Sequence, residues 1–231
     1  MTDLITAIVP AAGVGSRMQA DRPKQYLTLH GHTVLEHTVE KLLSHPAIGQ
    51  VVIAVSPGDP YFAELSLAAH PRVVRVDGGS ERADSVLSAL NYLCQQQLSN
   101  QWVMVHDAAR PCVQHADISR LIEAAQEHPV GAILAAPVRD TMKRGDGSGN
   151  IDHTVERVAL WHALTPQMFR IRPLRDALAQ ALQQQIAITD EASAFEWLGD
   201  KPGLVASRAD NIKITQPEDL ALADFYLRQK V

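Results

Sequence analysis

The chain has 231 residues and a formal net charge of -5, with 46% apolar and 20% charged residues. This length can bury the hydrophobic core of one large α/β domain, so we expect a single domain over residues 1–231. The negative charge disfavours broad binding to nucleic acid or to acidic membranes, because both partners need a positive field. The N-terminus carries no signal pattern, and no apolar run reaches the ~20 residues that span a bilayer. Together with only two cysteines, these features predict a cytoplasmic protein with reduced thiols.

Short apolar segments alternate with amphipathic ones along the chain. The expected strands are 5–9, 51–55, 73–76, 102–105, 132–136, 204–207 and 212–215. The expected helices are 34–43, a weaker one at 61–68, 82–97, 118–127, 173–184, 189–198 and 218–229. Thr33 with Glu36 and Thr215 with Glu218 match capping boxes, which mark helix starts. Strands that are apolar almost throughout are typical of a mostly parallel sheet covered on both faces, the three-layer α/β class.

Residues 138–165 interrupt this alternation and predict a β-hairpin with a glycine-rich tip at 145–150. Two interpretations are open for a hairpin inserted in a compact α/β unit. It is either a surface excursion, which the composition alone favours, or an arm that docks on a second subunit.

The segment that follows the first expected strand, residues 10–18, is rich in small residues. Gly13 would let the backbone turn its N–H groups toward an anion, while Arg17 and Lys24 add positive charge suited to phosphate. A glycine turn between a strand and a helix would explain the glycines but not the two cations. A dinucleotide fingerprint would need glycine where Met18 stands and an acidic residue after the second strand, and the chain has neither. We therefore predict a phosphate-binding loop.

A second glycine-rich turn, residues 77–85, lies between an expected strand and an expected helix. It is either a tight turn with Ser80 as the helix N-cap or part of a site that recognises base and ribose. The turn falls at the same sheet edge as the first loop, where open α/β sheets bind ligands. The residues leave both interpretations open.

Charged residues lie at two further expected strands. Asp107 emerges from a buried strand at this edge, where a carboxylate can hold Mg²⁺ against a triphosphate. The alternative is a salt bridge with Arg110 at the rim. Asp210 and Lys213, near the last expected strand, are by themselves more typical of a turn residue and a solvated strand lysine.

As a set, these motifs resemble the bacterial methylerythritol phosphate cytidylyltransferases, in the same order and at about the same spacing over nearly the whole chain. The matching segments are 10–17, 23–26, 77–85, 105–111, 136–143, 164–167, 189–193 and 211–213. The resemblance implies a nucleotide-diphospho-sugar transferase-like sheet with an inserted β-arm. It also implies a homodimer that interlocks through the arm at 138–165, and a Mg²⁺ requirement. The implied reaction, in isoprenoid precursor synthesis, joins CTP and 2-C-methyl-D-erythritol 4-phosphate to give 4-diphosphocytidyl-2-C-methyl-D-erythritol and pyrophosphate.

The resemblance also implies roles for individual residues. The CTP triphosphate would bind Ala11, Ala12, Gly13, Arg17 and Lys24, and Lys213 would reach the phosphates from the other side. Cytosine and ribose would be read by Gly79, Ser80 and Ser85, with Asp107 near the metal. The polyol phosphate would be held by Thr141, Thr165 and Arg157, the last reaching in from the second subunit.

Two rival functions remain open at this point. Ribitol-5-phosphate cytidylyltransferases are similar to this family and use the same chemistry, so the choice of polyol depends on the acceptor-side residues. A protein that binds CTP without turning it over is the rival from a different class, and the retention of both Arg17 and Lys24 argues against it.

Overall fold

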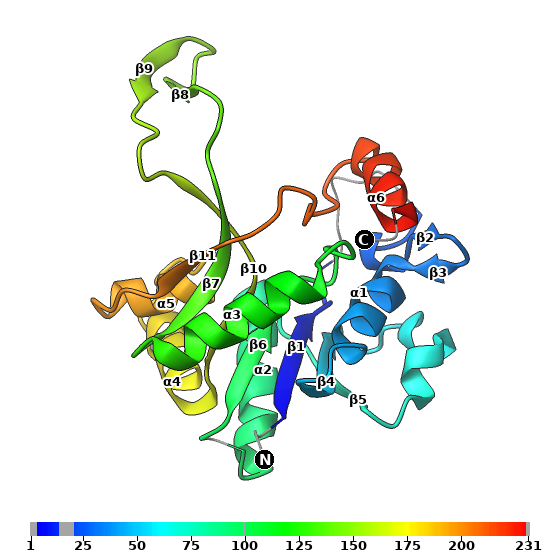
Figure 1. Ribbon diagram of the computed structural model, residues 1–231. Helices are drawn as coiled ribbons and strands as arrows, with labels where there is room; N and C mark the ends of the chain where they lie inside the picture. The colour runs from blue at the N-terminus through cyan, green and yellow to red at the C-terminus, as the bar shows by residue number, and fades with distance from the viewer. Residues whose placement is uncertain (1–3, 14–20, 99, 230–231) are drawn as a thin grey trace.

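The computed structural model describes residues 4–13, 21–98 and 100–229, which form a seven-stranded sheet in the order β11-β7-β10-β6-β1-β4-β5 (Figure 1). Its strands are β1 Ile5–Pro10, β4 Ile48–Val55, β5 Val73–Asp77, β6 Trp102–Val105, β7 Gly131–Pro137, β10 Trp161–Arg170 and β11 Gly203–Ala206. Only β10 runs antiparallel to its neighbours among these strands. The mostly parallel sheet confirms the predicted fold class.

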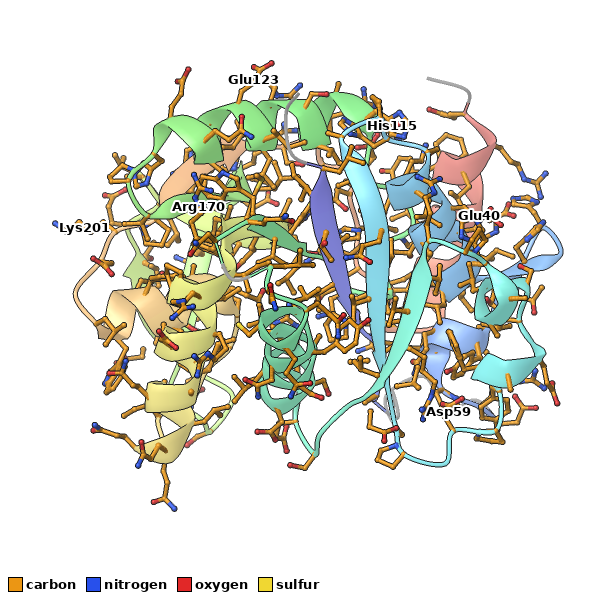
Figure 2. All side chains as sticks on the ribbon, turned by 90° about the horizontal axis from the view of Figure 1, so that it is seen from below. Glu40, Asp59, His115, Glu123, Arg170 and Lys201 are labelled. Atoms are coloured by element: carbon orange, nitrogen blue, oxygen red, sulfur yellow. The ribbon has the colours of Figure 1, made fainter. Side chains whose placement is uncertain are left out.

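Helices cover both faces of the sheet. They are α1 Val34–Leu43, α2 Arg82–Gln95, α3 His115–Glu127, α4 Ile171–Gln183, α5 Glu191–Trp197 and α6 Glu218–Arg228. Leu35 of α1 and Ile118 of α3 belong to one buried apolar cluster, whereas Val86 of α2 and Leu174 of α4 belong to another. Figure 2 shows α3 along one side of the sheet and α4 along the other. Among the described residues, no helix is long and apolar enough to span a membrane.

Strand β1 shows why the strands of this sheet are apolar almost throughout. Ala7 and Val9 pack in the cluster beneath α1 and α3, while Ile8 between them packs in the cluster beneath α2 and α4. All three side chains are fully buried. A central parallel strand has no face left for water, so both of its faces must be apolar.

Two predicted elements are wrong, and the chain packs differently there. The weak helix at 61–68 is a pair of 3-10 helices, η3 Phe62–Glu64 and η4 Ser66–Ala69, separated by the extended backbone of Leu65. Residues 212–215 form no strand, although the Ile214 N–H donates to the Ala109 carbonyl at 2.8 Å. Ile214 is buried in a small cluster with residues of α1 and α6, so its apolar character reflects packing beneath helices rather than a place in the sheet.

The two predicted capping boxes differ in outcome. At the start of α1, the Glu36 N–H donates to Thr33 Oγ1 at 3.1 Å and the Thr33 N–H donates to the Glu36 carboxylate at 2.8 Å, which confirms the first box. The second is wrong, because Asp219 rather than Glu218 accepts from the Thr215 N–H, at 2.7 Å. The carboxylate that reaches back lies one residue further into α6 than the motif predicts.

The predicted hairpin is present and projects away from the sheet (Figure 1). Its strands β8 Met142–Gly145 and β9 Ile151–Val155 pair antiparallel with each other. At the tip, the Asp146 carboxylate accepts from the N–H groups of Ser148 at 2.7 Å and Asn150 at 3.1 Å, which orders the glycine-rich turn. The chain returns through β10, a strand that was not predicted. A second small hairpin, β2 Thr28–Leu29 with β3 His32–Thr33, was not predicted either.

Candidate active site

A cleft of about 470 Å³ opens at the carboxyl ends of the parallel strands β1 and β6. Most of the predicted site residues line it: Ala11, Ala12, Gly13, Lys24, Gly79, Ser80, Ser85, Asp107 and Lys213. Thr141, Arg157 and Thr165 are not among its lining residues, and Arg17 lies outside the residues that the structure describes. Segments from both halves of the chain therefore meet in one hollow.

The loop after β1 is held by a residue to which the sequence assigned no role. The buried Gln25 side chain donates to the carbonyls of Ala11 at 2.7 Å and Gly13 at 3.0 Å. Ser56 Oγ donates to the Ala12 carbonyl at 2.9 Å. These bonds occupy the carbonyl oxygens of the loop and so reduce the negative potential that they would present to an anion.

Two lysines reach the cleft from segments that are far apart in the sequence. Lys24 begins the short 3-10 helix η2 Lys24–Tyr26, and its Nζ donates to the carbonyl of Ile214 at 2.8 Å. This bond joins segments 190 residues apart and places Lys24 beside the stretch that carries Lys213. Since both lysines line the cleft, the local positive charge predicted for a phosphate site is present despite the negative charge of the whole chain.

The turn after β5 approaches the first loop so closely that only glycine fits. A Cβ on Gly78 would lie 2.7 Å from the Ala12 Cβ and 2.8 Å from Ser85 Oγ. A Cβ on Gly79 would lie 2.3 Å from the Asp84 Cβ. The Gly79 N–H donates to Ser85 Oγ at 3.1 Å, which fixes the turn against the first turn of α2.

The start of α2 differs from the predicted N-cap. Glu81 rather than Ser80 is the N-cap residue, and the Asp84 carboxylate reaches back to accept from the Glu81 N–H at 3.0 Å. The Ser80 hydroxyl donates to the same carboxylate oxygen at 2.8 Å. Ser80 thus lines the cleft while its hydroxyl is held by Asp84.

Three cations surround Asp107, whose side chain is only 8% exposed. Arg82 Nε lies 3.0 Å from Oδ1, while Lys213 Nζ at 2.9 Å and Arg110 Nε at 3.4 Å face Oδ2. Burial by itself would raise the pKa of this carboxyl, but the three cations outweigh burial and hold the pKa well below its usual range. The predicted alternative, an ion pair with Arg110, is therefore present, together with two partners that were not predicted.

Behind Asp107, a chain of hydrogen bonds runs through two buried side chains. The Asp107 N–H donates to Thr165 Oγ1 at 3.0 Å, and this hydroxyl lies 3.0 Å from His106 Nδ1. His106 Nε2 lies 3.0 Å from the carbonyl of Arg110, which can only accept, so Nε2 carries the hydrogen. Burial lowers the pKa of His106 to about 4, so the ring is neutral near pH 7 and Nδ1 accepts from the Thr165 hydroxyl.

Comparison with known proteins decides the family. Residues 5–229 match the family model described as 2-C-methyl-D-erythritol 4-phosphate cytidylyltransferase. The chain belongs to this family. Its membership confirms the resemblance carried by the motifs and makes the chain a cytidylyltransferase.

Relatives and solved structures agree with this family. The 2-C-methyl-D-erythritol 4-phosphate cytidylyltransferase of Vibrio cholerae is 75% identical over 223 residues, which are 96% of each chain. A crystal structure of 4-diphosphocytidyl-2C-methyl-D-erythritol synthase superposes with a TM-score of 0.86 at 39% identity and covers 98% of this chain and 100% of that one. The Thermus thermophilus cytidylyltransferase superposes with a TM-score of 0.80 at 32% identity, covering 98% and 100% of the two chains.

The three residues predicted to hold the acceptor of this cytidylyltransferase lie in two different environments. Thr165 is buried, with its hydroxyl engaged by Asp107 and His106. Thr141 and Arg157 are exposed at the base of the arm, where the Arg157 guanidinium donates to the carbonyl of Arg139. The contacts of these residues with an acceptor stay a prediction.

A second hollow of about 470 Å³ lies beside the first cleft and shares Lys213 with it. It is lined by Arg110, Ala136, Pro137, Arg139, Asp140, His162, Leu164, Ser207, Ala209, Asn211, Ile212, Lys213 and Asp219. The two hollows thus meet at one cation, an arrangement that suits a site for two phosphate-bearing substrates of the cytidylyltransferase.

Sequence reasoning assigned no role to three residues of this site. Gln25 holds the first loop, Arg82 bridges Asp107 to α5, and Glu191 of α5 receives that arginine. All three lie inside segments that matched the family pattern. Their partners are distant in the sequence, and spacing within a motif does not reveal such partners.

Proposed function

We propose that this chain transfers a cytidylyl group from CTP to 2-C-methyl-D-erythritol 4-phosphate and releases pyrophosphate. The observation that carries this proposal is the convergence of the loop after β1, the turn after β5, Lys24 and Lys213 on one cleft. Open α/β sheets bind nucleotides at this edge. The name of the family to which the chain belongs supports the choice of both substrates.

The chemistry needs alignment and charge neutralisation rather than a side-chain nucleophile. A phosphate oxygen of the acceptor, already an anion at neutral pH, attacks the α-phosphorus of CTP, and the bond from that phosphorus to the bridging oxygen of pyrophosphate breaks. Lys24 and Lys213 would neutralise charge that builds on the α-phosphate and on the leaving group. Arg17, proposed as a third cation, lies outside the described residues.

The nucleoside would lie against the turn after β5. Gly78 and Gly79 pack so closely against Ala12, Ser85 and Asp84 that no side chain fits at either position. Ser80 and Ser85 line the same wall, so base and ribose recognition is the proposed use of this turn. The alternative of a tight turn alone would not account for its place in the cleft.

Mg²⁺ is the proposed cofactor, with Asp107 as its protein ligand. Among the described residues, no group of three or more His, Cys, Asp or Glu side chains could hold a metal. Mg²⁺ needs no such group, because it keeps several waters and is held by one or two carboxylates together with substrate phosphates. Bound there, it would neutralise phosphate charge as the bond to pyrophosphate breaks. Both oxygens of Asp107 face cations, so a bound Mg²⁺ would replace a cation at one of these oxygens.

The arm is proposed to complete the acceptor site of a second copy. It projects away from its own sheet, and Ile151 is 65% and Val158 80% exposed, which fits surfaces that a homodimer would cover (Figure 1). Arg157 and Thr141 would then meet the acceptor phosphate in the partner's hollow, next to Lys213. The alternative of a free surface excursion leaves these apolar side chains in water.

A cytoplasmic location is proposed with the function. Both substrates are charged, water-soluble phosphates. The thiols of Cys94 and Cys112 are free, as is typical of a reducing compartment.

Pyrophosphate release tests this function. The purified chain would be given CTP and Mg²⁺ with 2-C-methyl-D-erythritol 4-phosphate, with ribitol 5-phosphate or with no acceptor, and the release would be measured. We expect release only with the first acceptor, and none after a chelator removes the metal. Release only with ribitol 5-phosphate would favour the rival polyol, whereas CTP binding without any release would favour a non-catalytic protein.

A further inference from the structure

We propose that Glu191 is a positioning residue that fixes Arg82 in the cleft wall, so that Arg82 holds the Asp107 carboxylate in place instead of binding phosphate. The inference rests on the proposed function, because it concerns the same site. It assigns Arg82, a cation that lines the nucleotide cleft, to a partner inside the protein.

Glu191 is a buried carboxylate with one cationic partner that engages both of its oxygens. Its side chain is 1% exposed, and Arg82 donates to Oε1 from Nη1 at 2.7 Å and to Oε2 from Nη2 at 3.0 Å. A bidentate pair of this kind fixes orientation as well as distance. A buried charge is expensive unless it is paired and hydrogen-bonded, so the arrangement is specified rather than incidental.

The backbone that carries Glu191 is itself anchored to the central sheet. Gln167 of β10 accepts from the Ala192 N–H at 3.0 Å and donates to the Asp190 carboxylate at 2.8 Å. Asp190 in turn caps α5 by accepting from the Ser193 N–H at 3.0 Å. Glu191 sits between these anchors, so it can impose a fixed position on the guanidinium it binds.

The guanidinium of Arg82 has three donor nitrogens, and each has an acidic partner. Nε donates to Asp107 Oδ1 at 3.0 Å, while the two terminal nitrogens donate to Glu191. Arg82 is thus a bridge between two carboxylates. The other oxygen of Asp107 faces Lys213, so the position of Arg82 also sets where the Asp107–Lys213 pair stands in the cleft.

The charges around Asp107 also support a positioning role for Glu191. Arg82, Arg110 and Lys213 all face Asp107, and Arg82 also faces Glu191. Within this group of described residues, three cations meet two carboxylates and one positive charge remains. Of the three cations, Lys213 lines both hollows, whereas Arg82 lines only the first and Arg110 only the second. Without the Glu191 charge, Arg82 would keep Asp107 as its one acidic partner among the described residues and could turn toward the nucleotide.

The test compares Glu191→Gln with Glu196→Gln, a matched control on an exposed position of the same helix. We expect Glu191→Gln to lower kcat by about ten- to one-hundredfold, as small misplacements of site groups do. The KM for CTP and the CTP affinity measured by calorimetry without acceptor should stay the same or improve, because the freed guanidinium adds attraction to phosphate. The control should change neither. An unchanged kcat, or CTP affinity that falls in step with kcat, would overturn the proposal.

A double-variant cycle asks whether Glu191 acts through Arg82. Arg82→Lys keeps the charge but cannot form the planar bidentate pair with Glu191. If Glu191 works only by holding Arg82, the double variant loses no more kcat than Arg82→Lys alone, whereas additive losses contradict the proposal. Glu191→Asp, which keeps the charge on a shorter side chain, should retain more activity than Glu191→Gln and serves if Glu191→Gln fails to fold. Equal losses in these two variants would also count against the proposal.

A readout without turnover separates this inference from the proposed function. In a ¹⁵N spectrum, the Arg82 Nε–H signal, identified by its loss in Arg82→Lys, should exchange slowly with water in the wild type and quickly in Glu191→Gln. If the wild type released no pyrophosphate, the proposed function would be wrong, but the exchange measurement would still test whether Glu191 holds Arg82. Equal exchange in both proteins would overturn the positioning role even in an active enzyme.

Discussion

The hydroxyl of Thr165 accepts a hydrogen bond from the backbone N–H of Asp107 at 3.0 Å. The same hydroxyl faces His106 Nδ1 at 3.0 Å, so β10 is tied to the loop that carries the central carboxylate of the cleft. Resemblance to the family implied that Thr165 holds the acceptor. Its observed partners lie within the protein, which makes its contribution to loop geometry directly testable.

Replacing Thr165 by valine should cost stability as well as activity. Valine keeps the shape but leaves the Asp107 N–H without its side-chain acceptor, which should lower the free energy of unfolding by about 1–3 kcal/mol. Thr165→Ser keeps the hydroxyl and should lie close to the wild type. Urea denaturation and pyrophosphate release measure the two effects. A valine variant with full stability and reduced activity would instead support direct contact between Thr165 and the acceptor.

His106 should make the free energy of unfolding depend on pH. Its pKa is about 4 in the folded protein, against an ordinary value of 6.5, because burial disfavours the charged ring. Between these two pH values the unfolded chain binds more protons than the folded protein. The stability that the neutral His106 ring contributes is therefore fully present above pH 6.5 and is lost as the pH drops toward 4. The slope from this one group should approach about 1.4 kcal/mol per pH unit.

Urea unfolding at several pH values would measure this dependence in the wild type and in His106→Gln. The stability difference between the two proteins should narrow as the pH falls through that window. His153→Gln, on the exposed arm, is the matched control and should follow the wild type. A difference that does not change with pH would contradict the neutral, buried ring.

Removing either lysine of the cleft should slow catalysis more than it weakens nucleotide binding. Loss of one preorganised cation removes on the order of 3–4 kcal/mol of transition-state stabilisation, a rate loss of roughly 10²–10³. Lys24→Ala and Lys213→Met should therefore lower kcat strongly and raise the Kd for CTP much less. Lys201→Met, on an exposed residue outside the cleft, should behave as the wild type. Lys24 also donates to the Ile214 carbonyl, so its replacement could lower stability. The Tm of each variant is therefore compared with that of the wild type. An unchanged kcat in Lys24→Ala would refute its assignment.

Subunit mixing should reveal whether the arm completes a neighbouring site. Arg157→Ala and Lys24→Ala proteins should each be nearly inactive, but a mixed dimer would hold one site with both residues intact. Random exchange should then restore about one quarter of the wild-type activity, since half of the dimers are mixed and each has one intact site. Activity would be followed while exchange is monitored by mass spectrometry of a labelled subunit. Exchange without recovery would place Arg157 outside the neighbouring site.

Local patterns along the chain predict much of the fold. Strands apolar on both faces, such as β1, and the glycine-rich arm were predictable because burial and turn geometry act on neighbouring residues. The two misassigned segments have different causes. Ile212 and Ile214 are apolar because they pack against α1 and α6. The sequence of β10 does not predict a central strand, because it includes Pro166 and Gln167.

The sequence by itself determined the family and the mostly parallel sheet, and it predicted nine of the residues that line the cleft after β1 and β6. The tertiary structure alone decided which charged residues around the cleft pair with one another. The pair formed by Arg82 and Glu191 joins positions 109 residues apart, and Lys24 meets a carbonyl 190 residues away. Periodicity and motif spacing report on forces between neighbours in the chain, whereas the charge of a site depends on partners that only folding brings within a few ångströms.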